Sequence, residues 1–160
     1  MIIKMIVAID LYEGISLNGK LPWKIKEELK FFRDKTIGHS VIYGRKTYDS
    51  MNSILDGRKN YILTRNRDLK VKDAEIIHEI ESIVYKYKDS SNILYIIGGK
   101  SIYELFISYV EELIISQINK KYVCDTYVDM NLLLHDFNLI DVYLLDTKKD
   151  DIYISTYKRL

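Results

Sequence analysis

The sequence predicts a single α/β domain built on a mostly parallel sheet. Short apolar runs rich in β-branched residues alternate along the chain with segments of helical spacing, which is the pattern of strand and helix units. Glycines follow two of these runs, at Gly44 and Gly98, where a buried parallel strand would turn into a helix. Near the end of the chain, two apolar runs flank a charged turn at residues 147–151, which predicts an antiparallel hairpin.

The predicted strands are apolar runs bounded by glycine, asparagine or charged loops. In order, we expect strands at residues 2–9, 40–43, 60–64, 75–77, 93–97, 112–118, 137–145 and 152–157. The helices are predicted where apolar residues recur at helical spacing or where a glycine ends a strand. We expect helices at residues 25–35, 44–51, 80–87 and 101–108. Together these elements predict a sandwich with a central twisted sheet of about eight strands and about four flanking helices.

Length and composition are those of one ordinary domain, which we expect to span residues 1–160. The single cysteine, Cys124, excludes an internal disulfide and fits a reducing compartment. A net charge of +1 offers no basic field, so we expect neither nucleic acid nor membrane as a partner. The first apolar run is too short, and too interrupted by Lys4, for a signal peptide or a membrane span. The three histidines lack ligand spacing, so no metal is expected.

The first functional pattern is the segment Asn18-Gly19-Lys20-Leu21-Pro22-Trp23, with Glu28 at the start of the following helix. Pro22 fixes its own backbone angle and steers Leu21 away from helical geometry, so the loop should arrive extended at the helix. Trp23 would place a rigid apolar wall beside Glu28, and apolar surroundings raise the pKa of a carboxyl group. The pattern predicts a proton donor near neutral pH beside a mobile loop.

Three turns at predicted strand ends are suited to phosphate groups. Gly98-Gly99 would let a phosphate approach backbone N–H groups at a helix start, although such pairs also mark ordinary turns. Gly44-Arg45-Lys46-Thr47 adds two cations and a hydroxyl, and Thr64-Arg65 could hold a separate phosphate such as the 2′-phosphate of NADP. Each cationic turn alone is more typical of a solvated surface than of a phosphate site, and it is the two turns together with the glycine pair that favour a phosphate site. Because ligands bind beyond the carboxyl ends of parallel strands, we expect these turns and the Trp23 loop to converge on one cleft. The G-x-G-x-x-G fingerprint of a conventional dinucleotide fold is missing.

Taken in order, these motifs resemble the dihydrofolate reductase family, in its bacterial chromosomal type. The most specific pieces are Val7-Ala8, Leu21-Pro22-Trp23 with Glu28-Leu29, Gly44-Arg45-Lys46-Thr47, Leu55-Asp56-Gly57-Arg58-Lys59-Asn60, Ile97-Gly98-Gly99 with Ile102-Tyr103, and Asp125-Thr126. The resemblance covers the whole chain. It implies NADPH-dependent reduction of 7,8-dihydrofolate to tetrahydrofolate, by hydride transfer with protonation of N5, in one-carbon metabolism. It also implies an antifolate target that is cytoplasmic and monomeric, without a metal or a covalent intermediate.

The resemblance also assigns roles to residues. Glu28 would bind the pterin and support protonation of N5, Ser116 would stand where the family has a threonine, and Arg58 would pair with the glutamate α-carboxylate of the substrate. The implied catalytic group is Glu28, Trp23, Ser116 and Tyr103. The implied substrate-binding residues are Ile6, Val7, Ala8, Glu28, Leu29, Phe32, Arg58, Ile97 and Ser116. The implied cofactor-binding residues are Ala8, Ile15, Gly44, Arg45, Lys46, Thr47, Leu63, Thr64, Arg65, Ile97, Gly98, Gly99, Lys100, Ser101, Ile102, Tyr103 and Thr126.

Five positions depart from the usual pattern of the family: Ser16, Lys26, Tyr48, Ile114 and Cys124. None of them removes a group that does chemistry, and we expect them to bear on loop motion and on the pKa of the acid. Ser16 replaces a common glycine of the active-site loop.

Two other functions stay open. One is a related NADPH-dependent pyrimidine reductase of riboflavin synthesis, against which Trp23, Glu28 and Arg58 argue because they suit a pterin and a glutamate tail. The other is a folate- or nucleotide-binding module without turnover, since a fold does not guarantee chemistry. Retention of Glu28 argues against that second alternative.

Overall fold

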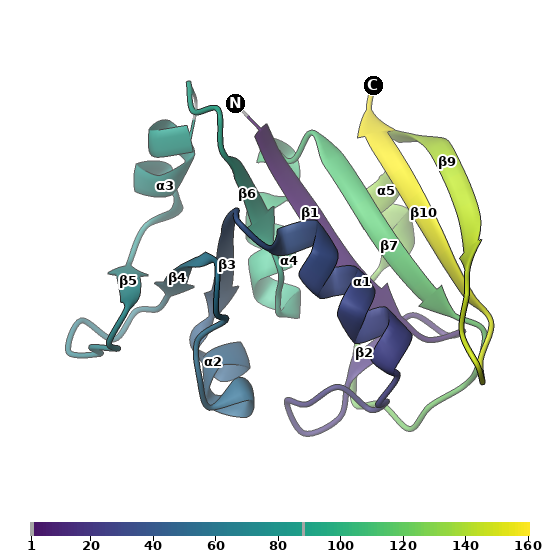
Figure 1. The fold of residues 1–160 in the computed structure, drawn as a ribbon. Coiled ribbons are helices and arrows are strands. Elements are labelled where there is room, and N and C mark those ends of the chain that lie inside the picture. The colour runs from purple at the N-terminus through teal and green to yellow at the C-terminus, as the bar shows by residue number, and fades with distance from the viewer. Residues whose placement is uncertain (1, 88) are drawn as a thin grey trace. The chain divides into compact units, whose positions relative to one another are not determined.

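The computed structural model describes residues 2–87 and 89–160. Its main sheet has eight strands in the order β5-β4-β3-β6-β1-β7-β10-β9, mostly parallel and with an antiparallel C-terminal pair (Figure 1). This confirms the predicted fold class, with five α-helices among the described residues in place of about four. The contacts divide the chain into two compact units. Unit 1 takes its residues from 1–5 and 36–110, and unit 2 takes its residues from 6–35 and 111–160.

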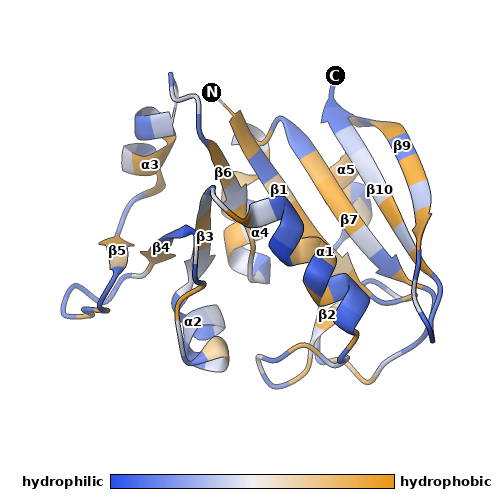
Figure 2. Ribbon diagram, in the orientation of Figure 1, coloured by the Kyte–Doolittle hydropathy of each residue, from blue (hydrophilic) through white to orange (hydrophobic). Residues whose placement is uncertain are grey.

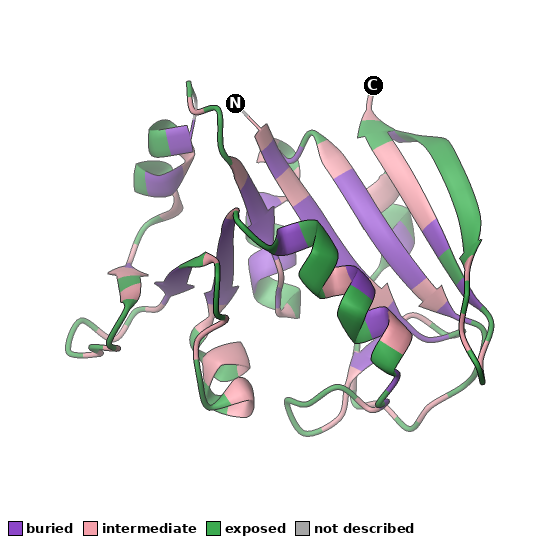
Figure 3. Cartoon of the chain, viewed as in Figure 1, coloured by how far each residue is buried: buried purple, intermediate pink, exposed green. Residues whose placement is uncertain are grey.

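Unit 1 is the parallel part of the sheet. From its edge inward it contains β5 (Ala74–Ile77), β4 (Lys59–Leu63), β3 (Ser40–Gly44), β6 (Ile93–Ile96) and the first half of β1 (Ile2–Ile9), and every recorded pair is parallel. Its helices are α2 (Arg45–Met51), α3 (Ile80–Tyr87) and α4 (Lys100–Phe106), followed by a 3₁₀ turn, η1 (Ile107–Tyr109). Strands β3 and β6 are almost wholly buried, as expected of parallel strands covered on both faces (Figure 3).

Unit 2 contains the second half of β1, helix α1 (Lys26–Thr36) as far as Lys35, and the antiparallel strands β7 (Glu112–Ile118), β10 (Ile152–Arg159) and β9 (Phe137–Leu145). β10 pairs with β7 on one side and with β9 on the other. β7 is largely hydrophobic and buried along its middle (Figure 2), whereas β9 is exposed along most of its length. A separate two-stranded sheet joins β2 (Gly14–Ser16) to β8 (Thr126–Tyr127), and α5 (Met130–Leu134) is capped by the Asp129 carboxylate.

The sequence missed three short elements, β2, β8 and α5, because two to five residues cannot display a period of their own. One helix face was also wrong. We expected the apolar residues at helical spacing to be Ile25, Leu29, Phe32 and with them Phe31. Ile25 and Phe31 are buried, but Leu29 is 46% exposed and Phe32 is partly exposed. The buried residues of α1 itself are Glu28, Phe31 and Thr36. The expectation that residues 1–160 form one domain stays a prediction, since the contacts alone divide the chain in two.

Candidate active site

Glu28 lies in the first turn of α1, in unit 2, and its carboxyl group is buried. Its side chain is only 5% exposed. Backbone N–H groups at a helix start favour a charged carboxylate, yet burial wins and raises the pKa of Glu28 to about 7. A carboxyl group with this pKa is partly protonated at neutral pH, so it can both hold and release a proton there.

Trp23, five residues before Glu28, is buried as the sequence predicts. Its ring meets the ring of Tyr122 edge to face, with centroids 5.4 Å apart. Its indole Nε1 has no hydrogen-bond partner in the part of the chain that the structure describes. A buried donor left unpaired costs about 1–3 kcal/mol, so this N–H is well suited to an acceptor that a ligand or a water molecule supplies.

The loop before Trp23 is fixed to another loop of unit 2 through Asp125. The backbone N–H of Asn18 donates to Asp125 Oδ2 at 2.9 Å, and the N–H of Asp125 donates to the carbonyl of Ser16 at 3.0 Å. The Asn18 N–H, and after it the Thr126 hydroxyl, hold the pKa of Asp125 below its usual range. Asn18 and Gly19 form the loop turn with positive φ angles, whereas Ser16 ends a β-strand, where no glycine is required.

Asp10 is a buried carboxylate for which no role was predicted from the sequence. Its carboxylate is buried and accepts from the N–H groups of Tyr12, Gly14 and Tyr122 at 2.8–2.9 Å, with the Cys124 thiol at 3.7 Å. Burial, the largest influence, would raise the pKa of Asp10, but the three N–H donors together lower it. Asp10 thus ties two loops of unit 2 together. The sequence did contain a signal for this role, because Asp10 is an acidic residue directly after the apolar run of β1.

In unit 1, the structure places three predicted turns next to one another. Gly44 ends β3, Thr64 follows β4, and the Gly98-Gly99 pair follows β6. These three strands are parallel neighbours, so their carboxyl ends share one edge of the sheet. The Gly44 N–H donates to the carbonyl of Gly98 at 2.9 Å, which links two of the turns directly.

Among the glycines at this edge, Gly98 is required by its backbone angle, and Gly44 lies close to a neighbouring side chain. Gly98 has φ +120°, and a Cβ there would lie 3.1 Å from the hydroxyl of Tyr103. That hydroxyl donates to the carbonyl of Ile97 at 3.0 Å, and the Gly98–Gly99 peptide is cis. A Cβ on Gly44 would lie 3.1 Å from Ile102. The chain therefore keeps open backbone where a ligand could approach closely.

Most polar residues of these turns are exposed, Thr47 and Thr64 are partly exposed, and three of the apolar residues are buried. Arg45 pairs with Asp49 at 3.7 Å along α2, and the Thr64 hydroxyl accepts the N–H of Asn66 at 3.1 Å. The predicted residues with exposed side chains are Arg45, Lys46, Arg65, Lys100 and Ser101. Those with buried side chains are Leu63, Ile102 and Tyr103. The N-caps of α2 and α4, Gly44 and Gly99, lack a side-chain cap, so the first N–H groups of both helices can donate to a ligand.

Arg58, also in unit 1, is held in a defined direction. Its Nε donates to the Asp56 carbonyl at 2.9 Å, and one terminal nitrogen donates to the Thr36 hydroxyl at 3.1 Å. The loop before it is fixed by buried Asn60, whose amide bonds the backbone of Leu55 twice and that of Arg58 once. The sequence reading gave Asn60 no role, although a polar residue in a buried strand was a signal for one.

The remaining predicted residues belong to unit 2, except Ile97. Ile6, Val7, Ile15 and Ser116 are buried, while Ala8, Phe32, Ile97 and Thr126 are partly exposed. The single cleft that we expected would draw on both units and stays a prediction. Among residues 2–87 and 89–160, no group of three potential ligands could hold a metal ion, and no helix is long and apolar enough to cross a membrane.

Known proteins match this chain over almost its whole length. The family model described as dihydrofolate reductase matches residues 2–159. The dihydrofolate reductase of Staphylococcus haemolyticus is 32% identical over 161 residues, which cover 99% of this chain and 96% of that protein. A protein of Mycoplasmoides gallisepticum named segregation and condensation protein A is 35% identical over 156 residues, but the matched 97% of this chain spans only 25% of that protein. The structure of dihydrofolate reductase from Enterococcus faecalis complexed with NADP(H) and RAB-propyl has a TM-score of 0.91 at 25% identity, covering 99% of this chain and 96% of that chain.

Proposed function

The chain belongs to the dihydrofolate reductase family, and we propose that it reduces 7,8-dihydrofolate to 5,6,7,8-tetrahydrofolate with NADPH, as the enzymes of this family do. The observation that carries this proposal is Glu28, a carboxyl group that is buried, in the first turn of a helix, and has a pKa of about 7. Reduction at this substrate requires one hydride and one proton, and Glu28 is suited to the second.

We assign the proton and the orientation of the pterin to unit 2 residues. Glu28 would accept hydrogen bonds from the pterin amino group and ring nitrogen in its anionic form, and would support protonation of N5 in its protonated form. The buried Trp23 indole N–H would donate to a bridging water molecule or to the substrate, because it has no acceptor among the described residues. Ser116, which is 1% exposed, would take the role of the family threonine beside the acid.

NADPH fits the edge of unit 1 formed by the Gly44, Thr64 and Gly98 turns. The observation that supports this fit is the backbone at Gly44 and Gly98, which no side chain of its own covers; a Cβ there would be in tight contact with Ile102 or Tyr103, at 3.1 Å. Arg45, Lys46 and Thr47 would hold phosphate groups, and Arg65 would hold the 2′-phosphate. When bound, NADPH supplies the hydride.

Arg58 would hold the substrate's glutamate α-carboxylate. Its bonds to Asp56 and Thr36 fix the guanidinium before substrate arrives, which lowers the entropy cost of a bidentate contact. We propose further that residues 1–160 act as one domain and that the enzyme is a cytoplasmic monomer. The pyrimidine-reductase and non-catalytic alternatives have no specific observation in their favour.

The test is loss of nicotinamide absorbance when the purified protein is mixed with NADPH and dihydrofolate. Glu28→Gln should retain NADPH binding and lose on the order of 10²–10⁴ in turnover at neutral pH, with a smaller deficit at low pH, where solvent supplies the proton. Glu27→Gln, on the same helix turn, is the matched control and should keep wild-type turnover. Near-normal neutral turnover of Glu28→Gln would remove this carboxyl group from the mechanism.

A further inference from the structure

A polar cavity opens in unit 1 at the sheet edge opposite the three turns. It has a volume of about 280 Å³ and lies where β3 and β4 begin, with Ser40 and Lys59 in its lining, and just before β6, with Asn92. Ser40 and Gly44 are four residues apart on β3, which amounts to roughly 13 Å at ~3.3 Å per residue. The cavity is therefore separate from the turns that we assign to NADPH.

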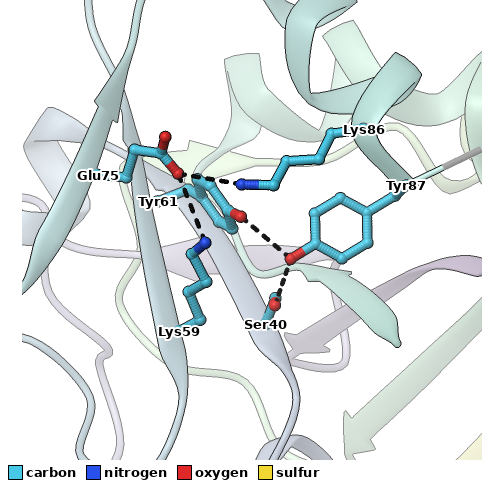
Figure 4. A network of polar contacts seen from close by, with 6 residues as sticks. All are labelled: Ser40, Lys59, Tyr61, Glu75, Lys86 and Tyr87. Carbon is cyan, nitrogen blue, oxygen red and sulfur yellow. Dashed lines mark hydrogen bonds and ion pairs between the residues drawn. The ribbon is translucent and has the colours of Figure 1, made fainter. Parts of the chain in front are cut away.

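Two lysines give the cavity its charge. Lys59 and Lys86 both line it, and their Nζ atoms lie 3.8 and 3.5 Å from the same carboxylate oxygen of Glu75 (Figure 4). Both ammonium groups also lie over the ring of Tyr61, at 5.1 and 5.3 Å from its centroid. One carboxylate shared by two ammonium groups leaves one net positive charge. Glu75 is outside the lining, and no acidic side chain is among the described residues that form it.

The inner wall of the cavity supplies neutral donors. The hydroxyls of Ser40 and Tyr87 are hydrogen-bonded to each other, and each of these residues is only 4% exposed. Tyr87 also meets the hydroxyl of Tyr61 at 3.2 Å (Figure 4). A hydroxyl pair can reorient its protons toward an incoming acceptor, because a hydroxyl hydrogen rotates freely. Gly38 and Gly57, both at positive φ, are joined by an N–H···O bond of 2.8 Å and form another part of the wall.

We propose that this cavity binds a phosphate dianion, either as the free ion or as the phosphoryl group of a small metabolite. Two ammonium groups and buried hydroxyls match the charge and the acceptor oxygens of phosphate. At about 280 Å³ the cavity is near the lower end of ligand-site volumes, so it suits a small phosphomonoester and not a dinucleotide.

The experiment is a calorimetric titration with inorganic phosphate at constant ionic strength, using protein saturated with NADPH so that the cofactor turns are filled. The double variant Lys59→Gln/Lys86→Gln should lose about tenfold or more in affinity, the worth of one charge-assisted hydrogen bond. The control Lys148→Gln/Lys149→Gln changes the net charge equally, at exposed positions of the C-terminal hairpin, and should bind as wild type does. Glu75→Gln should bind phosphate more tightly, because it frees both lysines from their shared carboxylate.

Glycerol phosphate titrated in the same way distinguishes the source of the ligand. Tighter binding than phosphate indicates the phosphoryl group of a metabolite, and equal or weaker binding indicates the free ion. If no binding is detected up to about 10 mM phosphate, the proposal is overturned, because the standard free energy of binding would then be weaker than about −3 kcal/mol. Equal losses in both double variants, or weaker binding by Glu75→Gln, overturn it as well. Turnover of dihydrofolate should be unchanged in all these variants, so failure of this proposal leaves the proposed function intact.

Discussion

Glu28 should make the protein less stable as the pH rises from about 4.5 to about 7. Its pKa is raised from 4.5 to about 7 in the folded protein, so the folded state binds more protons than the unfolded state between these two values. The contribution of the Glu28 carboxyl group to the free energy of unfolding is therefore fully present below the unfolded pKa. It is lost as the pH rises through the folded pKa. The difference between the pKa values of 4.5 and about 7 corresponds to a contribution to the free energy of unfolding of about 3 kcal/mol.

Glu28→Gln removes the titration and keeps the shape of the side chain. Without ligands, the free energy of unfolding of the variant should exceed that of wild type by up to about 3 kcal/mol at pH 8 and by less than about 1 kcal/mol at pH 5. Any effect of the substitution that does not depend on pH adds equally to both values. Urea denaturation at both pH values measures this difference. With a urea m value of about 2 kcal/mol/M, the midpoint at pH 8 should move by roughly 1.5 M. Glu27→Gln serves as the control on the same turn. If the stability gap between Glu28→Gln and wild type is the same at both pH values, burial does not perturb this carboxyl group as argued.

Three further predictions concern other named residues. Arg65→Ala should weaken NADPH binding by roughly 1.5–3 kcal/mol and NADH binding much less, measured by titration of each cofactor, and equal losses would reassign the 2′-phosphate site. Arg58→Leu should raise the Michaelis constant for dihydrofolate about tenfold or more but leave weak turnover of a dihydropterin without the glutamate tail nearly unchanged, and a comparable loss for both substrates would point to fold stability instead. Asp10→Asn should lower the free energy of unfolding by about 1–3 kcal/mol at pH 7, because the amide NH₂ group of asparagine would face a backbone N–H. This loss should shrink at low pH, where Asp10 of the wild type becomes protonated, and a loss independent of pH would contradict the argument.

The strands of the main sheet and the unusual setting of Glu28 could be predicted from the sequence, because both depend on local pattern. Residues 2–9 and 112–118 are apolar runs whose predicted bounds agree with β1 and β7. Glu28 was predicted from its place after Trp23, and both residues are buried, although Leu29, a further apolar residue of the same motif, is 46% exposed.

The long-range polar contacts were out of reach. Asp10 meets the N–H of Tyr122 across 112 positions of sequence, and Asn18 meets Asp125 across 107. The hydrophobic periodicity of a sequence does not predict hydrogen bonds between residues so far apart in the chain. The same is true of the cavity lined by Lys59 and Lys86, whose ammonium groups are brought together by Glu75 on a third element.

The course of β1 through both compact units has a consequence for how the protein is made. Neither unit is a continuous stretch of chain, so no single cut releases either of them as a fragment. During synthesis, the residues of unit 1 have all been made once residue 110 has emerged, whereas unit 2 waits for β10 at the end of the chain. A stop codon before residue 152 would leave β7 and β9 without the strand that both pair with, and would expose two unpaired strand edges to aggregation.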